Sequence, residues 1–253
     1  MATPRLAHRT LRQEIIATAR RMNALGINQG KSGNVSHRIA RGFLVTPTGM
    51  PYDALKPGDI VAMGLDGSHR GSRLPSSEWR FHRDILAARP EANAVIHTHA
   101  MFATTLACLG REIPPFHYMV AVAGGDSIRC APYATFGTEE LSRHAVGALE
   151  GRQACLLASH GMIAIGVTLE AALALAVEVE TLAAMYWRAL QVGEPHLLDG
   201  AEMARVLEKF RTYGQQTPAK PRAVSPPTLD EVAPSPRRVR RHARASFRRA
   251  RRR

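Results

Sequence analysis

The first stretch of the chain with a clear hydrophobic pattern is residues 6–25, where apolar side chains recur with the period of a helix. Its apolar residues fall at helical spacing, at Leu11, Ile15, Met22 and Leu25. This spacing puts apolar side chains on one face of a helix, and Gly26 follows at the position where glycine often ends a helix. We therefore expect an amphipathic helix packed on a core. Mitochondrial presequences share such an Arg-rich amphipathic pattern, although Glu14 argues against one.

Further along, short apolar runs between turn residues alternate with longer amphipathic runs. Strands are expected in the short runs, at residues 34–39, 42–47, 93–100 and 155–166, the last including a loop. Residues 58–71 have the pattern of a hairpin, because Asp66-Gly67 favours a tight turn between antiparallel strands. Helices are expected in the amphipathic runs, at residues 76–90, 101–110 and 168–190. This alternation predicts an α/β fold with a mixed sheet and helices on both faces.

The pattern ends in the C-terminal part of the chain, which divides it into two parts, residues 1–216 and 217–253. Residues 217–253 contain six prolines and a terminal arginine cluster, a composition that cannot bury enough apolar surface to offset the ordering of the chain. We expect a disordered basic tail. It has 12 Lys and Arg against 2 Asp and Glu, so +10 of the net charge of +13 belongs to it. Such a tail either stays solvated or contacts polyanions such as nucleic acid non-specifically.

Bulk composition restricts the remaining classes. The chain has 253 residues, 45% of them hydrophobic, and no apolar run approaches the roughly 18 residues that a membrane-spanning helix needs. We expect a soluble protein without a membrane partner. The three cysteines, Cys108, Cys130 and Cys155, are far apart and form no C-x-x-C pair. They are expected to be buried thiols of a cytoplasmic protein, since disulfides are rare in a reducing compartment.

Two histidines in the run "AVIHTHA", residues 94–100, suggest a metal site. In a strand, residues i and i+2 point to the same side, so His97 and His99 would face one space. A catalytic zinc site needs a third protein ligand. His160 in "ASHGM" is the candidate, because Gly161 lets the chain approach closely there. Taken alone, each histidine is more simply explained as a surface residue or a hydrogen-bonded core residue.

Glu78 in "LPSSEWRFH" lies in the first turn of an expected helix that begins near Ser76 and Ser77. A carboxylate there can simply complement the helix dipole. The free N–H groups and hydroxyls at a helix start can also bind phosphate. In that interpretation, Glu78 acts as a base beside the metal while Ser76 and Ser77 hold a phosphoryl group.

Two glycine-containing turns, "KSGNVS" and "TPTGMP", offer further donors. The order Gly-Lys-Ser at residues 30–32 lacks the upstream glycine of a nucleotide-binding P-loop. Gly33, Asn34, Thr48 and Gly49 could still donate neutral hydrogen bonds to phosphate. Ordinary turn chemistry is the alternative explanation.

Together, the motifs "SGNVS", "VTPTGMPYDAL", "LPSSEWRFH", "NAVIHTHA", "IPPFHYMVAVAGG", "APYATFGT", "SHGMIAIG" and "LEKFRTYG" resemble, in order and spacing, the class II aldolase and adducin family over about residues 5–215. The resemblance implies a three-layer α/β/α sandwich around a largely antiparallel mixed sheet. It also implies a homotetramer with sites between subunits. The basic tail is a departure, because the family pattern ends shortly after "TYG".

The resemblance also assigns roles to residues. It implies one Zn²⁺ or another divalent ion per subunit, bound by His97, His99 and His160, with Glu78 as the proton-transferring residue that can also lie against the metal. It implies a phosphate site formed by Gly33, Asn34, Thr48, Gly49, Ser76 and Ser77. Tyr118 would reach in from a neighbouring subunit as a second proton carrier, whereas Phe136 and Tyr213 would line the aldehyde side.

The implied activity is that of a metal-dependent aldolase. It would reversibly cleave a ketose 1-phosphate of the L-fuculose 1-phosphate type into dihydroxyacetone phosphate and a small aldehyde such as L-lactaldehyde. Three alternatives stay open: an aldolase for 5-deoxyribulose or methylthioribulose 1-phosphate, a sugar-phosphate 4-epimerase, and a polyanion-binding protein with an inactive aldolase domain. An adducin-like binding module would have lost the histidines, and all three are present.

Overall fold

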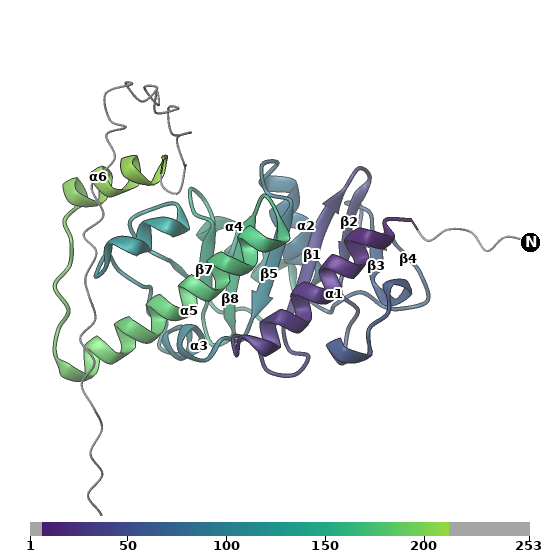
Figure 1. Cartoon of the computed structure of the whole chain (residues 1–253), viewed down its shortest axis with the longest axis horizontal. Helices are drawn as coiled ribbons and strands as arrows, with labels where there is room; N and C mark the ends of the chain where they lie inside the picture. Colours follow the sequence, from purple (N-terminus) through teal and green to yellow (C-terminus); the bar gives the residue numbers. More distant parts are fainter. Residues whose placement is uncertain (1–6, 213–253) are drawn as a thin grey trace, which may run out of the picture. The chain divides into compact units, whose positions relative to one another are not determined.

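One mixed sheet of eight strands runs through the part of the chain that this computed structural model describes, residues 7–212 (Figure 1). The strands lie in the order β4-β3-β2-β1-β5-β8-β7-β6. Neighbours are antiparallel except for the parallel pair β6 and β7. The strands are β1 (Asn34–Ile39), β2 (Gly42–Val45), β3 (Val61–Met63), β4 (His69–Arg70), β5 (Ala94–Thr98), β6 (Cys130–Ala131), β7 (Ala154–Leu157) and β8 (Gly161–Gly166).

Helices cover the sheet on both faces. The α-helices are α1 (Arg9–Ala24), α2 (Trp79–Ala88), α3 (Met101–Cys108), α4 (Glu139–Ala148), α5 (Leu169–Val192) and α6 (Gly200–Phe210), and the 3₁₀ turns are η1 (Tyr52–Ala54), η2 (Pro57–Asp59) and η3 (Tyr118–Ala123). In Figure 1, α1 and α5 cross one face of the sheet, and α2 and α4 lie behind it. The expected three-layer sandwich around a largely antiparallel sheet is confirmed.

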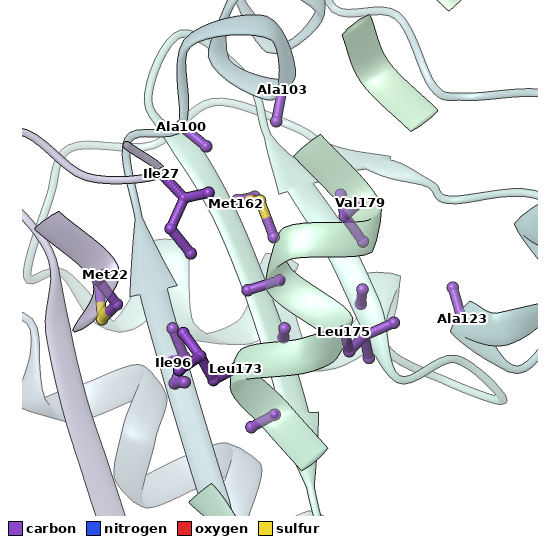
Figure 2. Packing of buried hydrophobic residues seen from close by; sticks show 14 of the residues in the cluster. Met22, Ile27, Ile96, Ala100, Ala103, Ala123, Met162, Leu173, Leu175 and Val179 are labelled. Carbon is purple, nitrogen blue, oxygen red and sulfur yellow. The ribbon is translucent and has the colours of Figure 1, made fainter. Parts of the chain in front are cut away.

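The two faces of the sheet bury two separate hydrophobic clusters. Along β5, Ile96 packs in the cluster with α1, α3 and α5, whereas Val95 packs in the cluster with α2 and α4. This is the alternation that a strand imposes on successive side chains. Figure 2 shows Leu173 and Val179 of α5 among the side chains that include Ile96. Full burial of each such aliphatic side chain contributes about 1.5–3 kcal/mol.

Several local predictions are confirmed in detail. Helix α1 ends at Ala24, and Gly26 adopts a left-handed φ of 72° directly after it. Strands β3 and β4 pair as a hairpin in which Gly67, at the turn, has a φ of 86°. Among the apolar residues of the first helical pattern, however, Leu25 lies beyond α1 and is 51% exposed. It does not pack on the core as expected.

Other expectations need correction. Residues 155–166 contain parts of two strands, β7 and β8, joined by a turn in which Ser159 has a φ of 53°. Helices α4 and α6 were not predicted, although Thr138 caps α4 by accepting a hydrogen bond from the Leu141 N–H. The cysteines are free thiols, but only Cys155 is buried, while Cys130 is half-buried and Cys108 is exposed.

The expected basic tail, residues 217–253, and Tyr213 lie outside the described residues, so their predictions stay predictions. Within residues 7–212, no helix combines the length and the apolar character required to span a membrane.

Candidate metal centre and active site

Three histidines meet where two paired strands reach the same edge of the sheet. His97 lies in β5, His99 follows its last residue, and His160 directly precedes β8. Strands β5 and β8 pair antiparallel, with Thr98 opposite Met162, so the C-terminal end of one lies beside the N-terminal end of the other. One ring nitrogen from each histidine lies within 4.8 Å of the others. The convergence predicted from the sequence is therefore present.

A glycine makes this close approach possible. A Cβ atom on Gly161 would lie 2.6 Å from the carbonyl oxygen of Thr98 and 3.0 Å from Cδ2 of His99. Any larger residue would push β8 away from β5. The left-handed φ of 53° at Ser159 then turns the chain so that His160 enters the space between the strands. The hairpin β7–β8 thus delivers the third imidazole.

The protonation of His97 follows from its surroundings. Its Nδ1 lies 2.9 Å from the carbonyl oxygen of Met162, which can only accept, so Nδ1 carries the proton. Burial lowers the pKa of His97 to about 3, and the ring is neutral. Its Nε2 lone pair therefore faces Nε2 of His99 at 3.0 Å. Burial also lowers the pKa of His99.

Glu78 completes the cluster from the start of α2. Its Oε2 accepts a hydrogen bond of 2.9 Å from Nδ2 of Asn34 and lies 3.3 Å from Nε2 of His97. Its Oε1 lies 3.0 Å from Nε2 of His160. Burial alone would raise the pKa of Glu78, but the contacts of its carboxylate with His160 and Asn34 outweigh the burial and lower the pKa to about 2. Glu78 is therefore a buried carboxylate anion.

These donor atoms fit a divalent cation. The lone pair of His97 Nε2 faces both another imidazole nitrogen and a carboxylate oxygen, an arrangement that is unfavourable without a positive charge between them. Within residues 7–212, Oε1 of Glu78 is also a buried oxygen that has no hydrogen-bond partner of good geometry. Three imidazole nitrogens and a carboxylate oxygen suit Zn²⁺ and related divalent ions.

A cavity of about 310 Å³ opens beside the cluster. Its lining contains five of the predicted site residues, Ser77, Glu78, His99, Phe136 and His160. It also contains four residues that sequence reasoning missed, Ser32, Tyr133, Ala134 and Ser159. Each of these four residues lies within three positions of a predicted one. Closeness along the chain to a predicted site residue could therefore have identified them. The cavity is large enough for a small phosphorylated sugar.

The other predicted phosphate residues gather around two turns near this cavity. An isolated bridge between Pro47 and Pro75 brings the turn with Thr48 and Gly49 beside the turn with Ser76 and Ser77. The Thr48 N–H donates to the Leu74 carbonyl at 3.2 Å. Lys31 links the first glycine-containing turn to the second, because its Nζ donates to the Gly49 carbonyl at 3.0 Å.

The start of α2 differs from the expectation. The helix begins at Trp79, and Glu78 occupies the N-cap position rather than the first turn. Ser76 is buried, and its Oγ accepts a hydrogen bond of 3.2 Å from the Glu78 N–H. The serines therefore precede the helix, and Ser76 serves the backbone of the carboxylate residue. Ser77 alone of the two lines the cavity.

Gly33 and Asn34 stand at the beginning of β1, close under the cluster. A Cβ atom on Gly33 would lie 2.5 Å from the carbonyl oxygen of His97, and the Gly33 carbonyl accepts a hydrogen bond from the Tyr52 hydroxyl. Asn34 is buried between Glu78 and His82. Its amide nitrogen thus already has one partner in the protein.

Tyr118 is not brought to the cluster within the chain. It begins η3, is 48% exposed, and lines a separate cavity of about 720 Å³ with Phe116 and residues of α6. Phe136 is also exposed, at 63%, but lines the cavity beside the cluster.

The fold and the site define an α/β sandwich in which three histidines that could hold a metal ion meet at the ends of two paired strands. Residues 13–187 match the family model described as Class II Aldolase and Adducin N-terminal domain. The chain belongs to the class II aldolase and adducin family.

Named relatives agree with this membership. A 5-methylthioribulose-1-phosphate/5-deoxyribulose-1-phosphate aldolase from Rhodospirillum rubrum is 61% identical over 213 residues, which cover 83% of this chain and 96% of the relative. An L-fuculose phosphate aldolase from Escherichia coli K12 is 53% identical over 205 residues, which cover 81% and 95%. A solved structure of an L-fuculose 1-phosphate aldolase superposes with a TM-score of 0.78 at 39% identity, covering 83% of this chain and 98% of that chain. The expectation of an enzyme of the aldolase class is confirmed.

Proposed function

We propose that the protein is a metal-dependent aldolase that reversibly cleaves a ketose 1-phosphate into dihydroxyacetone phosphate and a small aldehyde. The observation that carries the proposal is the meeting of three imidazoles and one buried carboxylate beside a cavity of about 310 Å³. Relatives named as aldolases for ketose phosphates support it. We further propose that it works in the cytoplasm.

Cleavage of the C3–C4 bond leaves negative charge on the fragment that becomes dihydroxyacetone phosphate. When bound by His97, His99 and His160, Zn²⁺ or another divalent ion supplies the Lewis acidity that stabilises this charge. No lysine Schiff base is then required. The imidazoles are suited to the task because burial keeps the pKa of His97 near 3 and its ring neutral.

Glu78 would carry the proton at C3. Its lowered pKa, about 2, keeps it ionised at neutral pH, and a carboxylate within reach of the reacting carbon can act as a general base. Its position at the N-cap of α2 holds the carboxylate between the cluster and the cavity. Ser77 and the turns around it would bind the phosphate, with the set completed by Gly33, Asn34, Thr48, Gly49 and Ser76.

Tyr118 would handle the proton on the C4 oxygen from a neighbouring subunit. Within one chain Tyr118 lines a different cavity from the one beside the cluster, so this role needs a neighbouring subunit. We therefore propose a homotetramer with sites between subunits. Phe136, and Tyr213 outside the described residues, would line the aldehyde side.

Two types of ketose 1-phosphate are candidate substrates, and they differ in the part that becomes the aldehyde. The relative at 61% identity is named for methylthioribulose and deoxyribulose phosphates, and the one at 53% for L-fuculose phosphate. Tyr133, Ala134 and Phe136 give the cavity an apolar side, which suits the methyl or methylthio end of either type. The higher identity favours the deoxyribulose type as the first substrate to test.

The decisive experiment is an enzyme-coupled assay for dihydroxyacetone phosphate release. The panel comprises L-fuculose, 5-deoxyribulose and methylthioribulose 1-phosphates, each with and without a chelator. We expect release from at least one ketose that stops with the chelator and returns with Zn²⁺. Full activity after complete removal of metal would refute the proposal. Conversion of L-ribulose 5-phosphate to D-xylulose 5-phosphate without aldolase activity would instead identify a 4-epimerase.

A further inference from the structure

A fourth histidine, His82, lies next to the site but does not line its cavity. His82 is on α2, four residues after Glu78, and is 0% exposed. Both side chains turn toward the sheet, because each is hydrogen-bonded to Asn34 of β1. His82 is not a member of the three-histidine cluster found among the described residues. Burying an imidazole fully is costly unless both ring nitrogens have partners.

Both nitrogens have partners on β1. Nδ1 of His82 lies 2.7 Å from Oγ of Ser36, and Nε2 lies 2.5 Å from Oδ1 of Asn34. Ser36 and Asn34 are two residues apart, so they point to the same side of the strand. Three side-chain hydrogen bonds thus join β1 to α2 and its N-cap residue: Asn34 to Glu78, His82 to Asn34 and Ser36 to His82.

The direction of each hydrogen bond follows from the chemistry. Oδ1 of Asn34 can only accept, so Nε2 of His82 carries the ring proton. Nδ1 of the neutral ring then accepts from the Ser36 hydroxyl. Burial lowers the pKa of His82 to about 3, which keeps the ring neutral. The three hydrogen bonds therefore form a chain with one direction: Ser36 donates to His82, His82 donates to Asn34, and Asn34 donates to the carboxylate of Glu78.

This direction determines the rotamer of the Asn34 amide. Rotating the amide by 180° would place its carbonyl oxygen against the Glu78 carboxylate and its NH₂ group against the N–H of His82. Both contacts would be repulsive. With the observed orientation, one N–H of Asn34 binds Glu78 and the second remains for another acceptor.

We propose that His82 is a positioning residue: it locks the Asn34 amide so that its NH₂ group holds the Glu78 carboxylate in place. The proposal rests on the proposed function, in which Glu78 moves the proton at C3. His82 touches neither the cavity nor the cluster of ligands and acts only through Asn34.

Two substitutions of matched chemistry test this role. In His82→Gln, the side-chain NH₂ reaches about as far as Nε2 of histidine and can still donate to Asn34. In His82→Asn, the amide ends near the position of Nδ1 and cannot reach. His37→Asn serves as the control, because His37 is on β1 but bonds to the carbonyl of Arg38.

The first readout is the exchange of the C3 hydrogen of dihydroxyacetone phosphate with solvent deuterium, followed by NMR. We expect His82→Asn to slow exchange by about 10–100-fold, the usual effect of losing a partner behind a metal site, with little change in KM. His82→Gln should stay within about threefold of the parent, and His37→Asn should match it. In an Asn34→Ala background, His82→Asn should slow the exchange hardly any further, because His82 acts on Glu78 only through Asn34.

The second readout is the Zn²⁺ affinity of the apoprotein, measured by competition with a chromophoric chelator. We expect His82→Asn to weaken it about tenfold, again without further loss in the Asn34→Ala background. Equal exchange and affinity in His82→Asn and the parent, or additive losses with Asn34→Ala, would overturn the proposal. A parent protein that binds Zn²⁺ yet never exchanges the C3 hydrogen would refute the proposed function alone, since the affinity series still tests His82.

Discussion

At the scale of single residues, the site depends on side chains whose protonation states are set by burial and by neighbours. A neutral His97 offers a lone pair because its Nδ1–H is bound to the Met162 carbonyl. Glu78 stays ionised although it is buried, because the contacts with His160 and Asn34 outweigh the desolvation that raises its pKa. A neutral imidazole and an ionised carboxylate therefore lie within 3.3 Å of each other.

Replacing the base should separate catalysis from metal binding. Glu78→Gln keeps the shape of the side chain and removes its negative charge, so we expect dihydroxyacetone phosphate release to slow by about 10²–10⁴-fold. Zn²⁺ should stay bound by the three imidazoles, which mass spectrometry of the metal content checks. Full turnover in Glu78→Gln would contradict the role of the carboxylate, whereas loss of the metal would show that Glu78 is mainly a ligand.

At the scale of elements, two contacts hold the edge of the sheet where the cluster forms. Strand β8 approaches β5 closely because Gly161 has no side chain. Helix α3 begins just after His99, and its first N–H groups are bound by α5: the N–H groups of Phe102 and Ala103 donate to Glu180 at 2.9 and 2.8 Å. Both ends of the segment that carries His99 are thus tied to neighbouring elements.

Crowding this edge should damage both the fold and the site. In Gly161→Ala, the added Cβ would meet the Thr98 carbonyl at 2.6 Å, so we expect a loss of about 1–3 kcal/mol in the free energy of unfolding. Urea denaturation measures the loss, and zinc affinity should fall with it because His160 moves.

The matched control is Gly147→Ala in α4, where a Cβ atom meets nothing within 4 Å. A helix gains about 0.5–1 kcal/mol from this change, so the control should raise stability slightly and leave zinc affinity unchanged. Equal stability of Gly161→Ala and the parent protein would show that β8 can move aside freely.

At the scale of the whole molecule, one chain does not assemble every proposed site residue. Glu78, His99 and His160 line one cavity, while Tyr118 lines another. The proposed role of Tyr118 therefore places it in the site of a neighbouring copy of the chain. The basic residues 217–253 add a charge of +10 to each copy.

Shared sites predict complementation between inactive variants. His99→Ala should lose the metal and Tyr118→Phe should lose the second proton carrier, so each is expected to be nearly inactive alone. Co-expressed in equal amounts, they should restore about a quarter of the sites, because a working site then needs two intact contributions from different subunits. The coupled assay measures the recovery, and co-expressed parent subunits set the scale. A mixture as inactive as its parts would exclude a shared site.

The charge of the C-terminal segment predicts salt-dependent binding to polyanions. The full chain should bind heparin at low salt, with an affinity that falls linearly in a plot of log K against log salt concentration. Deleting residues 217–253 should abolish this binding and leave aldolase activity within about twofold. If the truncated protein bound heparin equally, the polyanion contact would belong to residues 1–216 instead.

The sequence predicted much of this fold for reasons that are local. The spacing of apolar residues in α1, the Asp66-Gly67 turn and the two histidines one residue apart in β5 are each short-range patterns with one favoured conformation. Helix α4 was missed, although Thr138 and two glutamates mark its start. A loop was expected within residues 155–166, but not that the chain reverses there into two paired strands, because a run of 12 residues does not reveal the direction in which a chain leaves a loop.

By itself, the sequence determined the residue types of the site, the helical and extended segments that carry them, and the position of the basic segment, because these depend on neighbours along the chain. Only the tertiary structure decided that β5 pairs with β8, which brings His160 to His97 and His99, and that Asn34 joins Glu78 to His82. It also decided that Tyr118 lies at another cavity. Such contacts join residues tens of positions apart, and their energies arise only when strands pair and helices pack across them.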